Sequence, residues 1–428
     1  MPRLTKPIIV ALLSVVFGGP AAAQLRGHGG PVRALAVSAD GRLALSGSFD
    51  QSAILWAIDD GAALGVLRFH DGAVNAVATL PDGRFVTGAE DGRIALWQPG
   101  LPEPVRVFAE HEGPVVGLAI SPDGSMLASA SWDGTARTRP LAGGPARRLD
   151  GHKGNVNAVA YLPDGRLATV GYDATLRLWP GDDGPPVIVQ TASPLNTVAI
   201  AGDGEIATAG ADGTLRILTP GGDVRATVEL PPNPVIGLAL SPDGTRIAAA
   251  TIAGAVAVID RATAKVLFHL VGPGLPVWSL AYRPDGAEIL TGGGDRLVRR
   301  WNAANGEPIG PLAMQRPADA LAAFKGDHGA EVFSACVACH TLTPGEGRRA
   351  GPTLSGVFGR RIATAPDYKF SEPLKRLDIV WNAETIAKLF EVGPSRYTPG
   401  TKMPEQVIAN ARDRDALVKF LERATAER

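Results

Sequence analysis

The first three quarters of the chain consist of short apolar segments separated by polar turns, and the same arrangement recurs seven times. Each unit has an apolar strand such as residues 115–120, an Asp-Gly turn and a strand of small residues such as 127–131. A tight turn with an aspartate and a third strand follow. The first aspartate stands at positions 40, 82, 123, 164, 203, 243 and 285, so the period is close to forty residues. Such segments predict β-strands, and the fixed period predicts a repeat architecture.

Four residue types recur at fixed places within these repeats: a His, a Ser or Thr, an Asp and a Trp. In the first repeat they are His28, Ser46, Asp50 and Trp56. The second and fourth repeats also hold the complete set, the third has Arg139 in place of the Trp, and the sixth has lost the set. The pattern resembles the WD-repeat family. The resemblance implies an all-β, seven-bladed β-propeller in which these residues form a hydrogen-bond network inside each blade. The histidines are therefore expected to be structural rather than metal ligands.

Two features of the expected propeller stay open. The ring could be closed by residues 307–312 as the last outer strand, which would leave only residues 24–26 to overlap with the first blade. In this family, the residue before the tight-turn aspartate tends to lie near one rim. In the first five repeats these residues are Phe49, Glu90, Trp132, Tyr172 and Ala211. With Trp278, the aromatic members could form a contact surface for a partner, or they could pack against adjacent loops.

The start of the chain has the pattern of an export signal. Arg3 and Lys6 precede an apolar run over residues 8–17, and three alanines precede Gln24. We expect cleavage after Ala23 and a periplasmic, bacterial protein. The alternative is an uncleaved anchor, but a membrane span needs about 20 apolar residues. After cleavage, the protein is not expected to be an integral membrane protein.

Helical patterning replaces the strand pattern after the repeats. It covers residues 318–338, with a break near 326–329, and residues 385–392 and 413–424. We therefore predict four parts: a signal peptide over 1–23, a propeller over 24–313, a linker over 314–325 and an all-α domain over 326–428.

The two cysteines of the chain both lie in the segment Cys336-Val-Ala-Cys339-His340. In this motif the two thiols can add to the vinyl groups of a haem, and the histidine can bind the iron. A zinc site would need two further ligands, and a redox dithiol normally opens a helix after a strand. The sequence offers neither setting. It predicts one haem c, covalently bound through Cys336 and Cys339.

A candidate for the second iron ligand follows 63 residues after His340. Met403 lies in a polar loop rich in proline and glycine, residues 397–404, which is not the setting of a methionine that fills a core. The sequence therefore predicts His340 and Met403 as the two metal ligands.

Residues 329–424 resemble a class I cytochrome c of the mitochondrial-like group. Besides the haem motif, the matching segments are 351–354, 357–360, 365–366, Trp381, 397–403 and the last helix with Leu417 and Phe420. The resemblance implies that the carbonyl of Pro352 orients His340. It also places Phe333 and Phe420 at the crossing of the first and last helices.

Further residues of the haem site are implied by the same resemblance. Arg360 and Trp381 would lie near a haem propionate, Thr401 would seal the pocket, and Tyr397 begins the loop that carries the methionine. Phe370 and Leu389 stand where many relatives have tyrosines, and Tyr368 could replace the first of them. These departures leave the electron-transfer assignment intact but change the redox tuning.

A haem with both axial positions filled transfers single electrons and lacks an open site for oxygen chemistry. We therefore expect an electron carrier rather than an enzyme. Its propeller would dock a protein redox partner, such as a dehydrogenase, a reductase or a membrane respiratory complex, and the exposed haem edge would also contact it. The alternative is an oxidoreductase with a second cofactor or substrate site in the propeller. A haem-based sensor would require Met403 to be displaced easily.

Charge adds little to these expectations. The chain has 42 basic and 43 acidic residues, which gives no indication of nucleic-acid binding. From residue 318 onward, 16 basic residues face 14 acidic ones. This slight excess, with Lys402 beside the methionine, suggests electrostatic steering of an acidic partner.

Overall fold

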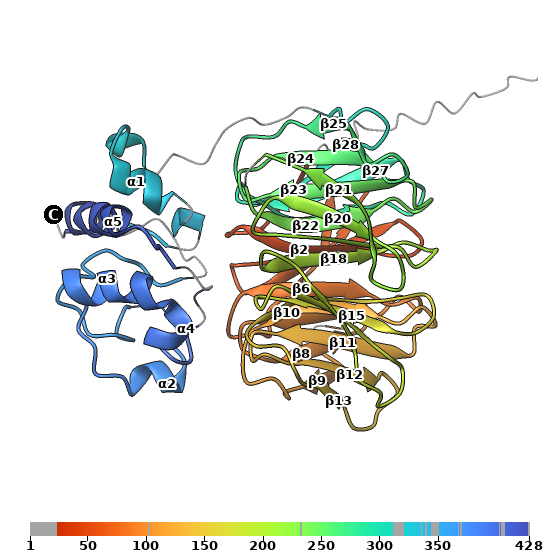
Figure 1. Ribbon diagram of the computed structural model, residues 1–428, viewed down its shortest axis with the longest axis horizontal. Coiled ribbons are helices and arrows are strands. Elements are labelled where there is room, and N and C mark those ends of the chain that lie inside the picture. Colours follow the sequence, from red (N-terminus) through yellow and green to blue (C-terminus); the bar gives the residue numbers. More distant parts are fainter. Residues whose placement is uncertain are drawn as a thin grey trace, which may run out of the picture.

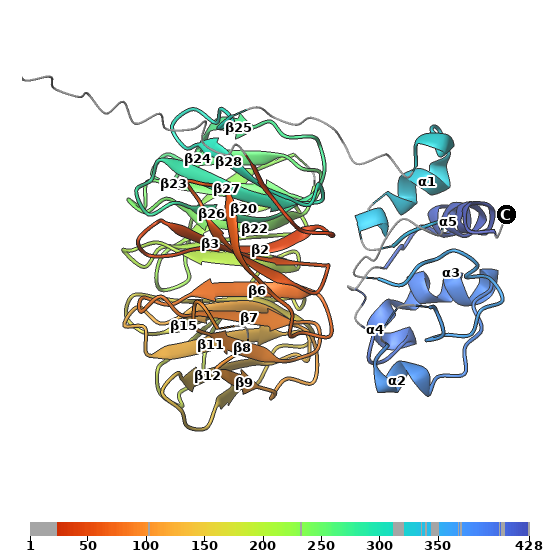
Figure 2. The ribbon, with the colours of Figure 1, turned by 180° about the vertical axis from the view of Figure 1, so that it is seen from behind.

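The computed structural model describes residues 24–101, 103–231, 233–310, 321–334, 336–338, 340–343, 351–366, 368, 370–401, 403 and 407–426. The expected signal peptide and most of the expected linker lie outside the described residues. The described chain forms a large β domain and a smaller helical domain that faces one flat end of it (Figures 1 and 2).

The β domain consists of seven four-stranded antiparallel sheets, which are the blades of a propeller. Blade 1 holds β2 (Val32–Val37), β3 (Leu43–Ser48), β4 (Ala53–Ala57) and β5 (Ala62–Leu67), and blade 2 holds β6 (Val74–Thr79), β7 (Phe85–Ala89), β8 (Ile94–Trp97) and β9 (Arg106–Phe108). Blade 3 holds β10 (Val115–Ile120), β11 (Met126–Ser131), β12 (Ala136–Pro140) and β13 (Arg147–Leu149), and blade 4 holds β14 (Val156–Tyr161), β15 (Leu167–Gly171), β16 (Thr175–Trp179) and β17 (Val187–Gln190). Blade 5 holds β18 (Leu195–Ile200), β19 (Ile206–Gly210), β20 (Thr214–Leu218) and β21 (Val224–Glu229), and blade 6 holds β22 (Val235–Leu240), β23 (Arg246–Thr251), β24 (Val256–Asp260) and β25 (Lys265–Leu270). Blade 7 holds β26 (Val277–Tyr282), β27 (Glu288–Gly293), β28 (Leu297–Asn302) and β1 (Gln24–Arg26).

The first strands of the blades form the inner ring. β2, β6, β10, β14, β18, β22 and β26 each contact the next in this order, and β26 contacts β2. This closed sequence of contacts confirms the seven-bladed ring that the repeats predict.

The structure shows how the ring closes, which the sequence left open. β1 pairs antiparallel with β28, with Leu25 opposite Val298, and becomes the outer strand of blade 7. Closure by residues from 307 onward is wrong, since in the described part of this segment only Pro308 forms a bridge, to Trp301. Backbone hydrogen bonds between the two ends of the propeller thus close the circle.

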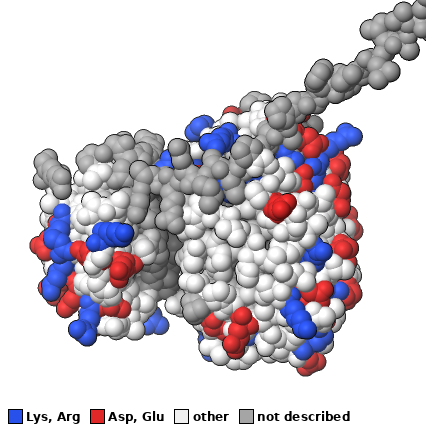
Figure 3. Space-filling model, turned by 90° about the horizontal axis from the view of Figure 1, so that it is seen from above, with Lys and Arg blue, Asp and Glu red and all other residues white. Residues whose placement is uncertain are grey.

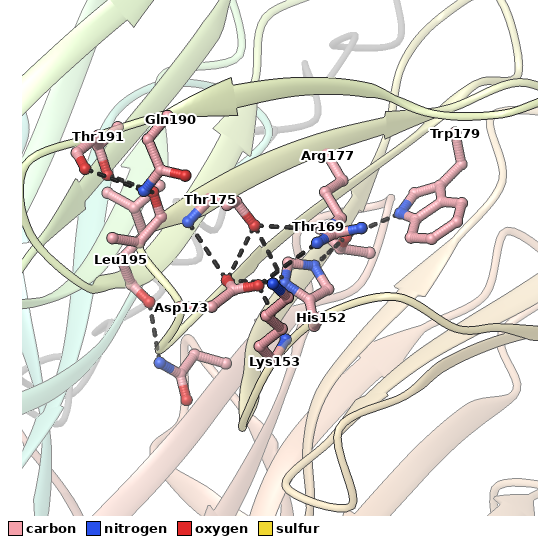
Figure 4. Close-up of polar contacts among 12 residues, drawn as sticks. His152, Lys153, Thr169, Asp173, Thr175, Arg177, Trp179, Gln190, Thr191 and Leu195 are labelled. Atoms are coloured by element: carbon pink, nitrogen blue, oxygen red, sulfur yellow. Dashed lines mark hydrogen bonds and ion pairs between the residues drawn. The ribbon is translucent and has the colours of Figure 1, made fainter.

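The network predicted inside the blades is confirmed, and Figure 4 shows it in blade 4. The indole Nε1 of Trp179 donates to the hydroxyl of Thr169 at 2.8 Å. His152 lies 2.8 Å from the same hydroxyl through Nε2 and 3.0 Å from Asp173 through Nδ1. Burial alone would raise the pKa of Asp173, but hydrogen bonds from the Lys153 backbone and from His152 lower it to about 2. Both ring nitrogens of His152 therefore have partners within blade 4, as expected for a structural histidine.

Blades 1 and 2 repeat this network, while blade 3 replaces it in part. His111 keeps its contacts with Ser129 and Asp133, each at 2.8 Å. In place of an indole, the guanidinium of Arg139 lies 4.0 Å from the ring centre of Phe108, in β9 of blade 2, and forms an ion pair with Glu110. At this place a cation–π contact between blades 2 and 3 replaces the indole.

The helical domain is small and is held together by its first and last helices. It contains η1 (Ala322–Phe324), α1 (His328–Phe333), η2 (Cys336–Ala338), α2 (Glu372–Lys375), α3 (Ala383–Val392), α4 (Pro394–Tyr397) and α5 (Ala411–Ala424). Phe333 and Phe420 meet where α1 and α5 cross, with ring centres 5.4 Å apart. Leu321 and Phe324, from the end of the expected linker, pack against this core.

Charges of both signs are interspersed over the visible surface of each domain, as Figure 3 shows from above. Within the described residues, no helix is long and apolar enough to cross a membrane.

Candidate functional site

A cavity of about 270 Å³ lies where the helical domain faces the propeller, and most of its wall belongs to the helical domain. Its wall brings together the ends of segments that are far apart in the sequence. From the helical domain it includes Cys336, His340, Pro352, Arg360, Tyr368, Trp381, Thr401 and Met403. Most of the remaining wall is apolar, with Leu354, Val357 and Phe390 among its members.

The ring of His340 is oriented by the backbone of a neighbouring loop. Its Nδ1 lies 2.8 Å from the carbonyl oxygen of Pro352, which is the contact that the family resemblance implies. A carbonyl can only accept, so Nδ1 carries the proton and Nε2 is the nitrogen that would bind a metal. The same contact increases the electron-donating character of the imidazole.

The thiol of Cys336 is buried in the cavity wall. Only 9% of this residue is exposed, and burial raises the pKa of its thiol to about 12. The thiol therefore lies on the apolar wall of the cavity, at the place where a thioether link to the apolar edge of a ligand would form. Cys339, the other predicted attachment point, lies outside the described residues.

Met403 reaches the cavity from a loop on another part of the domain. Its backbone N–H donates to the hydroxyl of Thr401 at 3.1 Å, and both residues line the cavity. The loop is tied down at Gly400, whose carbonyl accepts a hydrogen bond of 2.7 Å from Ser371. Gly400 has φ of +83°, and a side chain there would meet Pro373. Lys402, the predicted steering residue, lies outside the described residues.

Arg360 and Trp381 lie side by side in the wall. The backbone N–H of Trp381 donates to the carbonyl of Arg360 at 2.9 Å. The guanidinium of Arg360 donates to the carbonyls of Thr353 at 2.6 Å and Ser355 at 2.9 Å. These bonds hold a cation and an indole at one edge of the cavity, next to the loop that orients His340.

The positions that depart from the family pattern also lie in the wall. Tyr368 and Phe370 pack edge to face, with ring centres 4.7 Å apart, and both line the cavity. Leu389, on α3, lines it as well. Tyr397 is different, because it packs against the core of the domain and is not among the residues of the wall.

The wall fits a haem. It offers an imidazole and a thioether, which are ligands for haem iron, and a buried thiol for covalent attachment. It also offers a guanidinium, which suits the carboxylates that a haem carries. All four groups lie on one largely apolar cavity.

The sequence did not predict that the propeller would complete this cavity. Six propeller residues line it, and we call them the propeller wall: Arg33, Phe49, Asn75, Glu90, Trp132 and Trp278. The aromatic members were predicted as a contact surface for a partner or as packing within the propeller. Phe49 and Trp278 pack against each other and line the cavity, and contact with a separate partner stays a prediction. Tyr172 is 42% exposed and does not belong to the wall. No sequence signal pointed to Arg33 or Asn75.

Comparisons with known proteins agree with both domains. Residues 326–425 match the family model for cytochrome c, and residues 19–57, 61–98, 102–138, 143–180 and 264–302 match the WD domain, G-beta repeat. Over 98 residues the chain is 40% identical to a cytochrome c of Cochliobolus lunatus, covering 23% of this chain and 90% of that protein. It is 39% identical over 98 residues to a cytochrome c of Arabidopsis thaliana, covering 23% of this chain and 87% of that protein.

Proposed function

Because the chain belongs to the cytochrome c family through residues 326–425, we propose that it is a periplasmic single-electron carrier with one covalently bound haem c. Cys336 and Cys339 would hold the haem, and His340 and Met403 would bind its iron. The propeller would dock a protein redox partner. The observation that carries the proposal is that Cys336, His340 and Met403 share one cavity, with His340 already oriented by Pro352.

When bound, the haem supplies an iron that gains and loses one electron. The protein supplies the surroundings. The carbonyl of Pro352 holds the His340 ring in one orientation. His340 and Met403 would both be ligands of the iron, so a substrate would have no free place at the metal. Apolar side chains exclude water, and Arg360 balances negative charge at the cavity edge.

The proposed location and the single haem are supported by the sequence. The first 23 residues have the charge, apolar run and small residues of an export signal, and both cysteines lie in one attachment motif. Mass spectrometry of the protein purified from a periplasmic extract tests both points. A chain that begins at Gln24 and carries the mass of one haem is expected, and an uncleaved chain would contradict the location.

The ligand assignment is tested by substitution of methionines. Met403→Ala should remove the charge-transfer absorption of a methionine–iron bond from the oxidised protein. Met126→Leu, in blade 3, is the matched control and should leave the spectrum unchanged. A spectrum of Met403→Ala identical to that of the wild type would refute the assignment.

Cofactor analysis tests the alternative of an oxidoreductase. The electron carrier contains one redox centre per chain. A second redox-active group in the purified protein would favour a substrate-oxidising site in the propeller instead.

A further inference from the structure

The propeller wall comes from one sector of the ring. In each blade the pairing of the first two strands shifts register after the first residue, which leaves one bulge residue at the same place seven times. The bulge residues are Arg33, Asn75, Val116, Asn157, Asn196, Ile236 and Trp278. Those of blades 7, 1 and 2 line the cavity. The other three residues of the wall, Phe49, Glu90 and Trp132, precede the tight-turn aspartates of blades 1, 2 and 3.

The centre of the propeller wall is an aromatic pair with a cation against it. Trp278 packs edge to face on Phe49, with ring centres 5.8 Å apart. The guanidinium of Arg33 lies 5.4 Å from the centre of the Trp278 ring. The indole N–H of Trp278 is buried, and no acceptor for it lies among the described residues. The wall therefore presents an apolar surface, one cation in Arg33, one carboxylate in Glu90 and an unsatisfied donor beside the cavity.

We propose that the propeller wall is the lid of the haem site, so that the first docking partner of the cytochrome domain is the propeller of the same chain. The proposal rests on the proposed function, since it assumes a haem in the cavity. The aromatic residues keep water from the haem. Arg33 and the N–H of Trp278 suit the carboxylates of the haem, as Arg360 does from the opposite domain.

The lid has a consequence for the reduction equilibrium. Oxidised haem carries one positive charge more than reduced haem, so a nearby cation and a wall that excludes water both favour the reduced form. If the two domains dock through the propeller wall, substitutions in the propeller must therefore change the reduction potential of a haem that is bound in another domain.

The test uses the full haem-loaded chain. Arg33→Gln should lower the equilibrium constant for haem reduction about tenfold, which is about 59 mV for one electron. Its control is Arg68→Gln, at an exposed arginine that directly follows β5 of the same blade. Trp132→Ala should lower the constant about threefold by admitting water, whereas Tyr172→Ala, at the same position of the next blade, should leave it unchanged. Trp278→Phe keeps an aromatic ring but removes the N–H, and it should also lower the constant.

Visible spectra of the same samples separate the two proposals. A wild-type chain without a methionine–iron band would refute the proposed function. If the band is present in every variant and Arg33→Gln and Trp132→Ala keep the wild-type potential, the lid is wrong while the electron carrier stands. A circular dichroism spectrum like that of the wild type shows that a variant still contains a folded propeller.

Discussion

The close crossing of α1 and α5 depends on a glycine. Whether its replacement by alanine lowers or raises the stability of the cytochrome domain tests that crossing. A Cβ atom at Gly329 would fall inside contact distance of the carbonyl oxygen of Ala416 and would lie 2.5 Å from the Cβ of Phe420. Both atoms belong to the backbone or are bound to it directly, so neither can rotate away. Gly329→Ala therefore forces the two helices apart.

The expected magnitude is the difference between two effects. In a helix, alanine is about 1 kcal/mol more favourable than glycine. Inserting a methyl group into a packed crossing costs about 1–3 kcal/mol, and contact with a backbone oxygen favours the upper end of this range. We expect Gly329→Ala to destabilise the cytochrome domain by about 2 kcal/mol.

The assay is urea unfolding of the haem-loaded protein, followed by haem absorbance. Haem absorbance follows the binding of the proposed iron ligands, His340 and Met403, and both belong to the cytochrome domain. Lys419→Ala, at an exposed position of α5, is the control and should change the stability by less than about 0.5 kcal/mol. If Gly329→Ala is as stable as the wild type or more stable, helix propensity alone decides and the close crossing is wrong.

Three further predictions concern both domains. Thr169→Val leaves a buried indole N–H and a buried imidazole nitrogen unpaired and should destabilise the propeller by about 3 kcal/mol. Thr208→Val removes a hydroxyl that donates to the backbone carbonyl of Thr197 and should cost about 1 kcal/mol. Both are measured by urea unfolding followed by tryptophan fluorescence. Leu25→Asp places a charge at a position that is 1% exposed in β1 and should lower the thermal midpoint of the propeller; an unchanged midpoint would refute closure of the ring by β1. The protonated ring of His328 donates hydrogen bonds to the carboxylates of Asp413 and Glu331, and these bonds raise its pKa. Their stabilising effect is therefore complete below about pH 6.5 and is lost as the pH rises through the raised value. Asp413→Asn should weaken this dependence in urea unfolding.

The blades could be predicted because each is determined by its own local pattern. Blade 6 illustrates this, since it lacks the His, Thr and Trp of the network and still forms a complete sheet. Ala249 and Ile259 stand at the places of two of these residues, and both are fully buried. Alternation of apolar and polar positions, with turns at the right spacing, is sufficient to specify a blade.

Closure of the ring could not be predicted in the same way. β1 has only three residues, and its pattern of burial follows from its partner β28 rather than from its own sequence. A segment of three residues has too few positions to show a period of two. Its role depends on a contact between residues that are more than 270 positions apart in the sequence.

The haem-site residues could be predicted from local motifs, and the propeller wall could not. Cys336, His340 and Met403 lie in segments whose spacing and composition indicate their chemistry. Arg33 and Trp278 lie in strands whose pattern indicates only a propeller. Their place at the cavity depends on how two domains meet, and a pattern within one strand contains no information about that.

The length of the connection makes docking within the chain favourable. Gly310 and Leu321 are joined by ten intervening residues, which can span at most about 40 Å. The cytochrome domain therefore stays near blade 7, where the chain leaves the propeller, and the cavity wall is built from blades 7, 1, 2 and 3. A tether of this kind gives an effective concentration on the order of mM. A separate redox partner at a lower concentration must bind more tightly than the propeller wall to displace it, or must use another surface. The remaining blades, including the exposed Tyr172, offer such a surface while the lid stays closed.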